Sequence, residues 1–228
     1  MDPMPLIRSG DVETIRQAVA RDPALPRHKS ESGVSIICMA VYLRKDEIAH
    51  ALASYRQDLD VFEASSMGDL ARVRKLIESD PEAINAYSPD GFHPLGYSCF
   101  FGRREVFDHL LTQGADVNAP SRNAMQVRPL HSAVAQADPE TALRFAQCLL
   151  ERGALPNVVQ QGDFTPLHEA ALRGHLSLVC LLLRCGAAPE ARSTKGERPL
   201  ELAERAGHEE VIAILRAAAQ QSAAVDVR

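Results

Sequence analysis

The chain has 228 residues, 46% of them hydrophobic, and a formal net charge of −5 at pH 7. This hydrophobic content is enough for a core, and the length alone allows one or two globular domains. The acidic balance argues against nucleic acid as the partner, because nucleic-acid-binding domains concentrate basic residues on one face. No apolar run reaches the roughly 18 residues of a membrane span, and the start lacks the basic-then-apolar pattern of a signal peptide.

The cysteines are odd in number and form no Cys-x-x-Cys motif. This pattern indicates reduced thiols, so we expect a protein of a reducing compartment, the cytoplasm. We also expect these residues to be buried, since a free cysteine behaves as a small apolar side chain. The five residues are Cys38, Cys99, Cys148, Cys180 and Cys185.

Taken in chain order, residues 4–31 carry apolar residues at helical spacing and predict an opening cap. Residues 32–56 predict a pair of short helices, the first capped by Ser35. Arg44 stands between the two helices, where glycine is usual in the other units. Its backbone is strained if that turn needs a positive φ.

The next connection is unusually short. Residues 55–62 leave no room for the hairpin loop, or finger, that precedes the other helix pairs. We therefore expect Asp60 to cap the following helix directly and the row of fingers to have a gap. The sequence leaves open whether this junction bends the molecule or divides it.

The second half is more regular. Residues 85–117 predict a finger followed by two helices. Residues 118–155 have a longer finger and about four extra residues between the helices near Asp138. Residues 190–217 are more polar, as expected of a closing cap. Residues 218–228 lose the apolar periodicity and predict a frayed tail.

The most informative stretch is residues 165–175, which read TPLHEAALRGH. Thr165 can cap a helix, Pro166 suits the first helical position, and Gly174 can end the helix in the left-handed conformation. A second apolar helix follows and ends at Gly186. A unit this short cannot bury its own apolar face, so it needs neighbouring units.

Such neighbours recur along the chain. Aligning the residue between the two helices of each unit gives separations of 34, 24, 34, 35, 37 and 33 residues. The TPLH motif and this period resemble the ankyrin-repeat family, whose period is about 33 residues. The run DVFEA at 60–64 resembles that of uncharacterised prokaryotic ankyrin-repeat proteins. The aligned residues are Gly10, Arg44, Gly68, Gly102, Ala137, Gly174 and Gly207.

The resemblance implies an all-α ankyrin-repeat solenoid of about seven helix-turn-helix units with short β-hairpin fingers. We expect one such solenoid over residues 1–217. In this family the histidine of the TPLH motif ties the motif's hydroxyl to nearby backbone. We therefore expect His131 and His168 to be structural, although a metal site is the alternative for any histidine.

The sequence lacks the common catalytic motifs. It contains no Gly-x-Ser-x-Gly, no phosphate-binding loop and no His-Glu-x-x-His. We expect no catalytic residue, no metal and no cofactor. A small enzyme or metal protein remains the least favoured of three hypotheses.

Ankyrin proteins commonly bind partners on a concave face built from the fingers and the first helix of each unit. Aromatic residues and arginine dominate binding energy at interfaces, and both occur at these positions here. By register Phe100 and Phe101 both face this groove, and we expect at least one of them to contact a partner. We expect the arginines to favour an acidic or mixed partner surface. The predicted partner-binding residues are Tyr87, Asp90, Phe92, Phe100, Phe101, Arg122, Met125, Gln136, Val159, Phe164, Leu172, Arg173, Arg192 and Arg205.

The leading hypothesis is a monomeric, non-enzymatic module that binds a partner protein, with no nucleic acid or membrane partner. The alternative is a regulatory or immunity-type inhibitor that uses the same groove to occlude an enzyme or toxin. The sequence does not choose between these two roles or identify the partner.

Overall fold

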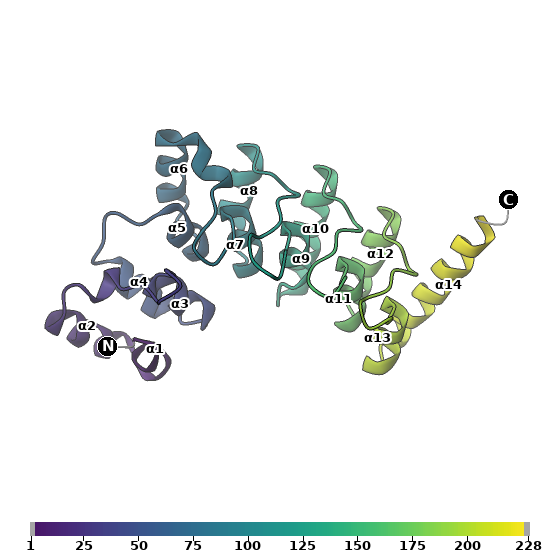
Figure 1. Ribbon diagram of the computed structural model, residues 1–228, viewed down its shortest axis with the longest axis horizontal. Helices are drawn as coiled ribbons and strands as arrows, with labels where there is room; N and C mark the ends of the chain where they lie inside the picture. Colours follow the sequence, from purple (N-terminus) through teal and green to yellow (C-terminus); the bar gives the residue numbers. More distant parts are fainter. Residues whose placement is uncertain (1–2, 226–228) are drawn as a thin grey trace. The chain divides into compact units, whose positions relative to one another are not determined.

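The structure is a computed structural model that describes residues 3–225 (Figure 1). In this range the regular structure is helical, apart from two isolated β-bridges, Lys29–Ser35 and Gln160–Phe164. The all-α prediction is confirmed, and the fingers are short hairpin loops rather than strands. The chain divides into two compact units, residues 1–116 and 117–228.

The first unit contains the helices up to residue 112, together with two short 3-10 helices labelled η1 and η2. Its helices pack in sequence, with α5 between α3 and α7 and with α6 against α8. Their bounds are α1 Met4–Ser9, α2 Val12–Arg21, η1 Leu25–Arg27, α3 Ile36–Tyr42, α4 Asp46–Ala53, α5 Val61–Met67, α6 Leu70–Ser79, η2 Pro81–Asn85, α7 Pro94–Phe101 and α8 Arg104–Thr112.

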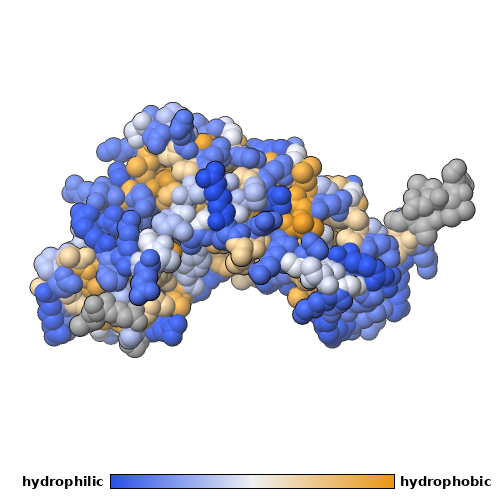
Figure 2. Space-filling model, in the orientation of Figure 1, coloured by the Kyte–Doolittle hydropathy of each residue, from blue (hydrophilic) through white to orange (hydrophobic). Residues whose placement is uncertain are grey.

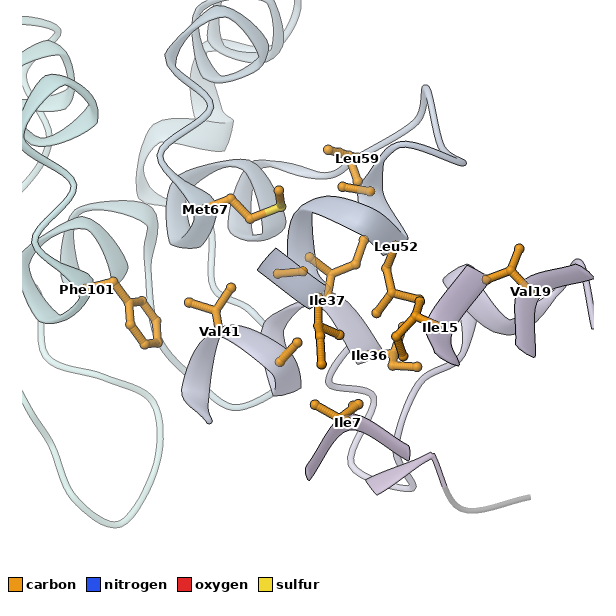
Figure 3. Close-up of a cluster of buried hydrophobic side chains, with 14 of the residues drawn as sticks. Ile7, Ile15, Val19, Ile36, Ile37, Val41, Leu52, Leu59, Met67 and Phe101 are labelled. Atoms are coloured by element: carbon orange, nitrogen blue, oxygen red, sulfur yellow. The ribbon is translucent and has the colours of Figure 1, made fainter. Parts of the chain in front are cut away.

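One apolar core runs through the first unit (Figure 3). It begins with Ile7 and Ile15 of the opening helices and extends through Leu52 and Met67 to Phe101. The short junction at 55–62 therefore lies inside one compact unit and does not divide the molecule there.

The junction itself is held by charged side chains. Asp60 caps α5 in a capping box with Glu63, as the sequence predicts for Asp60. The Arg56 guanidinium donates to Glu63 at 2.6 Å and to Asp58 at 3.1 Å. Glu63 is buried, with 1% of its surface exposed. Hydrogen bonds from Arg27 and Arg56 lower the pKa of Asp58 to about 2. This network takes the place of the missing finger.

The turn between α3 and α4 has the strained backbone that the sequence suggests. Arg44 adopts a φ of +58°, while Gly68 and Gly102 at the equivalent turns have φ values of +88° and +70°. The left-handed conformation suits glycine, because other residues bring Cβ close to the backbone carbonyl. Arg44 therefore occupies a position that glycine would fill with less strain.

The second unit is built from three regular helix pairs. The first helix of the middle pair, α11, packs between α9 and α13, and α12 packs between α10 and α14, so the helices form two layers (Figure 1). The bounds are α9 Pro129–Val134, α10 Pro139–Glu151, α11 Pro166–Leu172, α12 Leu176–Arg184, α13 Pro199–Ala206 and α14 Glu209–Val225.

The extra residues near Asp138 do not form a loop between helices: Asp138 caps α10, which has 13 residues where α12 has 9. The insertion therefore lengthens the helix by about one turn.

The stretch predicted as a tail, 218–228, is helical up to Val225, and its last three residues lie outside the described residues. The single solenoid over residues 1–217 stays a prediction.

The cysteines are free, but only two of them are buried. Cys38 and Cys99 lie in the interior, and burial raises the pKa of Cys38 to about 12. Cys185 is exposed, so the expectation of burial is wrong for this residue. Cys185 follows Arg184, the last residue of α12, at the point where the chain leaves the helix.

Candidate protein-binding surface

In the first unit, the fingers on either side of the missing one meet. A Cβ atom added to Gly33 would lie 3.1 Å from Cβ of Pro89. The finger between α4 and α5 is absent, as the sequence predicts, but the expected gap is closed by its neighbours. This closure brings the finger before α3 against the finger before α7.

The closure also joins side chains that are far apart in the sequence. The Tyr42 hydroxyl donates to one carboxylate oxygen of Asp90 at 2.7 Å, and the Tyr97 hydroxyl donates to the other at 2.6 Å. Burial raises the pKa of both tyrosines, and the bond to Asp90 adds to this for Tyr42. Both therefore remain protonated donors and hold Asp90 in place, while part of the surface of Asp90 stays exposed.

An aromatic cluster surrounds these groups. The ring of Phe101 lies 5.2 Å from that of Tyr42 and stacks on that of Tyr97 at 6.1 Å. Phe101 is only 5% exposed, so it is a core residue and its predicted place on the binding face is wrong. Phe100, the preceding residue of α7, lies edge-on to Phe101 with ring centres 5.2 Å apart, but it is 38% exposed. One of the two predicted aromatic residues thus reaches the surface.

The remaining aromatic residues of this region are half-buried. The ring of Tyr87 lies edge-on to that of His93 at 6.0 Å, and Phe92 packs against Tyr97 at the same distance. Phe92 also contacts the apolar core. These rings hold the finger against α7, and each leaves part of its surface open.

In the second unit, histidines tie each finger to the next helix pair. The backbone N–H of Arg128 donates to Nδ1 of His131 at 3.3 Å. Nδ1 is therefore the unprotonated nitrogen, and Nε2 donates to the carbonyl of Phe164 at 3.2 Å. Burial of the ring lowers the pKa of His131 to about 4, which keeps it neutral.

His168 repeats this arrangement one unit later. Its Nδ1 accepts from the backbone N–H of Thr165 at 3.1 Å, and Nε2 lies 3.1 Å from the carbonyl of Glu197. Thr165 also places its hydroxyl 2.7 Å from Nδ1 and caps α11. Burial lowers the pKa of His168 as well. These contacts agree with the structural role that the sequence predicts for both histidines. They fix the positions of the fingers.

Exposed apolar side chains stand on these fixed fingers. Met125 and Val159, on successive fingers, are 47% and 40% exposed. The backbone N–H of Gln161 donates to the Met125 carbonyl at 2.8 Å, so the two fingers are directly joined. Leu172, at the end of α11, is 37% exposed. The face of the molecule in Figure 2 is mainly hydrophilic, with apolar residues in separate patches.

Three other predicted residues of this unit have different surroundings. Gln136 is buried, with 5% of its surface exposed, and accepts from the backbone N–H of Ala137 at 2.7 Å. It closes the turn after α9, so its predicted place on the surface is wrong. Phe164 is half-buried, with its ring 4.9 Å from that of His168. Arg122 is exposed on the finger before α9.

The other predicted arginines are engaged by groups of their own unit. Arg173 forms an ion pair with Glu169, and Arg205 forms one with Glu197. Arg192 donates to a backbone carbonyl at 2.6 Å. These contacts partly satisfy the guanidinium groups, so the arginines attract an acidic partner less than their number suggests.

Two residues of the surface were not among those predicted. Tyr42 is 38% exposed and contacts Phe101, and the guanidinium of Arg44 lies over the rings of Phe100 and Phe101 at 5.7 and 5.6 Å. The presence of Arg44 where glycine is usual could have pointed to this site from the sequence alone. The contact of Tyr42 with α7 could not have been predicted from the sequence, because it depends on the closure of the fingers.

Comparison with known families agrees with this geometry. Residues 90–122 match the family described as "Ankyrin repeat", and residues 130–226 match "Ankyrin repeats (3 copies)". This chain belongs to the ankyrin-repeat family. The predicted family and fold class are confirmed. Ankyrin repeats use their extended surfaces to bind other proteins, so protein binding is the general function of this ankyrin-repeat chain.

Three relatives, all from animals, illustrate the similarity. Cyclin-dependent kinase inhibitor 2A of Homo sapiens is 39% identical over 122 residues, which cover 52% of this chain and 72% of the relative. Cyclin-dependent kinase 4 inhibitor B of Homo sapiens is 38% identical over 121 residues, covering 51% and 80%. Tyrosine-protein kinase Shark of Drosophila melanogaster is 29% identical over 172 residues, covering 74% and 18%. The expected likeness to prokaryotic proteins is not borne out.

Two further findings concern the described part of the chain. It contains no group of three or more histidine, cysteine, aspartate or glutamate side chains placed to hold a metal ion. Within the same range, no helix has both the length and the apolar character needed to cross a membrane.

Proposed function

We propose that this ankyrin-repeat chain binds its partner protein through the exposed finger and inner-helix residues of the second unit. The observation that carries the proposal is the pair Met125 and Val159, exposed on fingers that His131 and His168 hold in place. Apolar groups on a rigid support lose little conformational entropy on binding, which favours affinity. Leu172 extends the same surface along α11.

The proposed role is non-enzymatic. The motif histidines, which would otherwise be candidates for acid–base chemistry, are used as ties between backbone groups. Their lowered pKa values leave them neutral near pH 7 and engaged at both nitrogens. We expect the protein to act as a monomer in the cytoplasm, in keeping with its free cysteines, and to bind neither nucleic acid nor membranes.

A second candidate role is inhibition by occlusion of an enzyme. It is favoured by two relatives whose names describe inhibitors of cyclin-dependent kinases, one of them an inhibitor of cyclin-dependent kinase 4. A protein kinase is therefore the first enzyme class to test. Tight one-to-one binding with loss of kinase activity would distinguish this role from that of a scaffold.

The test uses the wild-type chain, the double variant Met125→Ser/Val159→Ser and the control Ile214→Ser. Ile214 lies on α14 and is 37% exposed, so the control removes a comparable apolar group elsewhere in the unit. Partners are recovered from the source cells, and cyclin-dependent kinase 4 serves as a purified probe in binding and activity assays.

We expect wild type and Ile214→Ser to retain the same partner, and the double variant to bind it at least about tenfold more weakly. Equal recovery with all three forms would contradict the proposed surface. Binding of the kinase without loss of its activity would contradict the inhibitor role for that kinase.

A further inference from the structure

Arg44 occupies a strained turn of the first unit. The backbone at this position is left-handed, with a φ of +58°, where the equivalent turns use Gly68 and Gly102. A residue in a sparsely populated conformation needs a compensating role, and such residues often stand at functional sites. The backbone of the turn does not require arginine, so any such role would lie in the contacts of its side chain.

The guanidinium group of Arg44 rests on an aromatic floor. Its carbon atom lies 5.7 Å from the ring centre of Phe100 and 5.6 Å from that of Phe101. A cation at this distance is attracted by the ring faces. Phe100 and Tyr42, whose rings both contact that of Phe101, are each 38% exposed. Together they present a fixed positive charge beside accessible aromatic surface.

The carboxylates near this site have other partners. Asp90 accepts hydrogen bonds from Tyr42 and Tyr97, and Asp46 pairs with Arg103 at 2.9 Å. Arg44 makes no ion pair with any described residue of the chain. Its side chain thus differs from Arg173 and Arg205, which are paired with glutamates in the second unit.

We propose that Arg44, Phe100 and Tyr42 form a subsite for an acidic side chain of a protein partner with an apolar residue beside it. A cation–π contact does not use the guanidinium N–H donors, and a carboxylate can accept two hydrogen bonds from them. The exposed parts of Phe100 and Tyr42 would contact the apolar neighbour. The proposal rests on the proposed function only in taking the partner to be a protein.

The test uses a library of random 12-residue peptides displayed on phage and the full-length chain as bait. Peptides are selected on wild type and then screened against Arg44→Gly, Arg44→Lys, Arg74→Gln and the double variant Met125→Ser/Val159→Ser. Arg44→Gly removes the cation and relieves the strain, so the variant is expected to fold. Arg74 is an exposed arginine of α6, and its substitution controls for the loss of one positive charge from the same unit.

We expect a class of peptides whose binding is lost with Arg44→Gly and kept with Arg74→Gln. These peptides should contain Asp or Glu next to an apolar residue. A synthetic peptide of this class should bind about tenfold more weakly after Glu→Gln replacement, which corresponds to 1.4 kcal/mol. Arg44→Lys should have an intermediate effect, since lysine keeps the charge but not the planar fork.

The proposal is overturned if no selected peptide depends on Arg44, or if the dependent peptides carry no acidic residue. The experiment distinguishes failure of this subsite from failure of the proposed function. Peptides that depend on Met125 and Val159 but not on Arg44 would leave the second-unit surface standing. Peptides that depend on Arg44 alone would support this subsite and contradict that surface.

Discussion

The two units of this chain solve the same packing problem differently. In the second unit, fingers recur regularly, and each is tied by a histidine to the backbone of the next, as with His131 and Phe164. In the first unit one finger is missing, and the junction is held by the Arg56–Glu63 ion pair and by contact between flanking fingers. Successive fingers are thus joined by neutral hydrogen bonds in the second unit, whereas the junction without a finger is held by a buried ion pair and by contact between the flanking fingers.

The sharpest test of this contrast is the adjacent pair Phe101 and Phe100. Phe101→Ala should destabilise the first unit by about 3–5 kcal/mol, because it removes a ring from a closed core. Phe100→Ser should change stability by less than about 1 kcal/mol, since that ring is partly exposed. Chemical denaturation followed by circular dichroism measures both. Equal losses of stability for the two variants would contradict the burial of Phe101 that the closure of the fingers produces.

The ion pair at the junction should be nearly as important. Arg56→Ala leaves the carboxylate of Glu63 buried and unpaired, which we expect to destabilise the first unit by about 3–5 kcal/mol. The double variant Arg56→Met/Glu63→Leu should recover much of that loss, because it removes both charges and keeps apolar volume. Arg74→Ala on exposed α6 is the matched control. If the double variant is no more stable than Arg56→Ala, the buried charge is not the cause.

The second unit should instead be sensitive to acid. The pKa of His131 falls from its ordinary 6.5 to about 4, so the unfolded chain binds more protons between these values. Stability should therefore be complete above pH 6.5 and decline by on the order of 3 kcal/mol as the pH falls to 4. His168 acts in the same direction. Denaturation at pH 7, 5.5 and 4 measures the decline.

Replacing the histidine provides the control for this pH effect. His131→Asn should be less stable at pH 7 but should lose less stability on acidification. His50→Gln, which changes an exposed histidine of α4, should retain the wild-type pH profile. A His131→Asn profile as steep as that of wild type would rule out the finger tie as the titrating group.

The smallest effect is expected at the strained turn. Arg44→Gly removes a left-handed arginine, which is worth about 1 kcal/mol, and also a cation–π contact of about 0.5–1 kcal/mol. These changes nearly cancel, so the melting temperature should stay within a few degrees of wild type. Thermal unfolding with Arg44→Ala as comparison checks this, because alanine loses the contact without relieving the strain. A large loss with Arg44→Gly would indicate that the side chain holds the core together.

Much of the fold was predictable because it is local. The caps at Thr165 and Asp60 and the strained turn at Arg44 depend on residues within a few positions of each other. The structural histidines follow from the repeat motif. These features need only the repeat register, which the spacing of the turns supplies.

The predicted surface was less reliable because exposure depends on neighbouring units. Phe101 and Gln136 occupy groove positions by register but are buried. Phe101 is covered because the missing finger brings Tyr42 onto α7, and Gln136 because it folds back onto the turn before the lengthened α10. In both places the repeat departs from its usual length, and a register taken from regular repeats does not apply there.

The central claim is that the partner contacts the fingers of the second unit, and hydrogen exchange with and without the partner tests it most directly. The account predicts slower exchange, on partner binding, in the fingers that carry Met125 and Val159 and at the end of α11. Protection confined to α10, α12 and α14, with the finger amides unchanged, would contradict it.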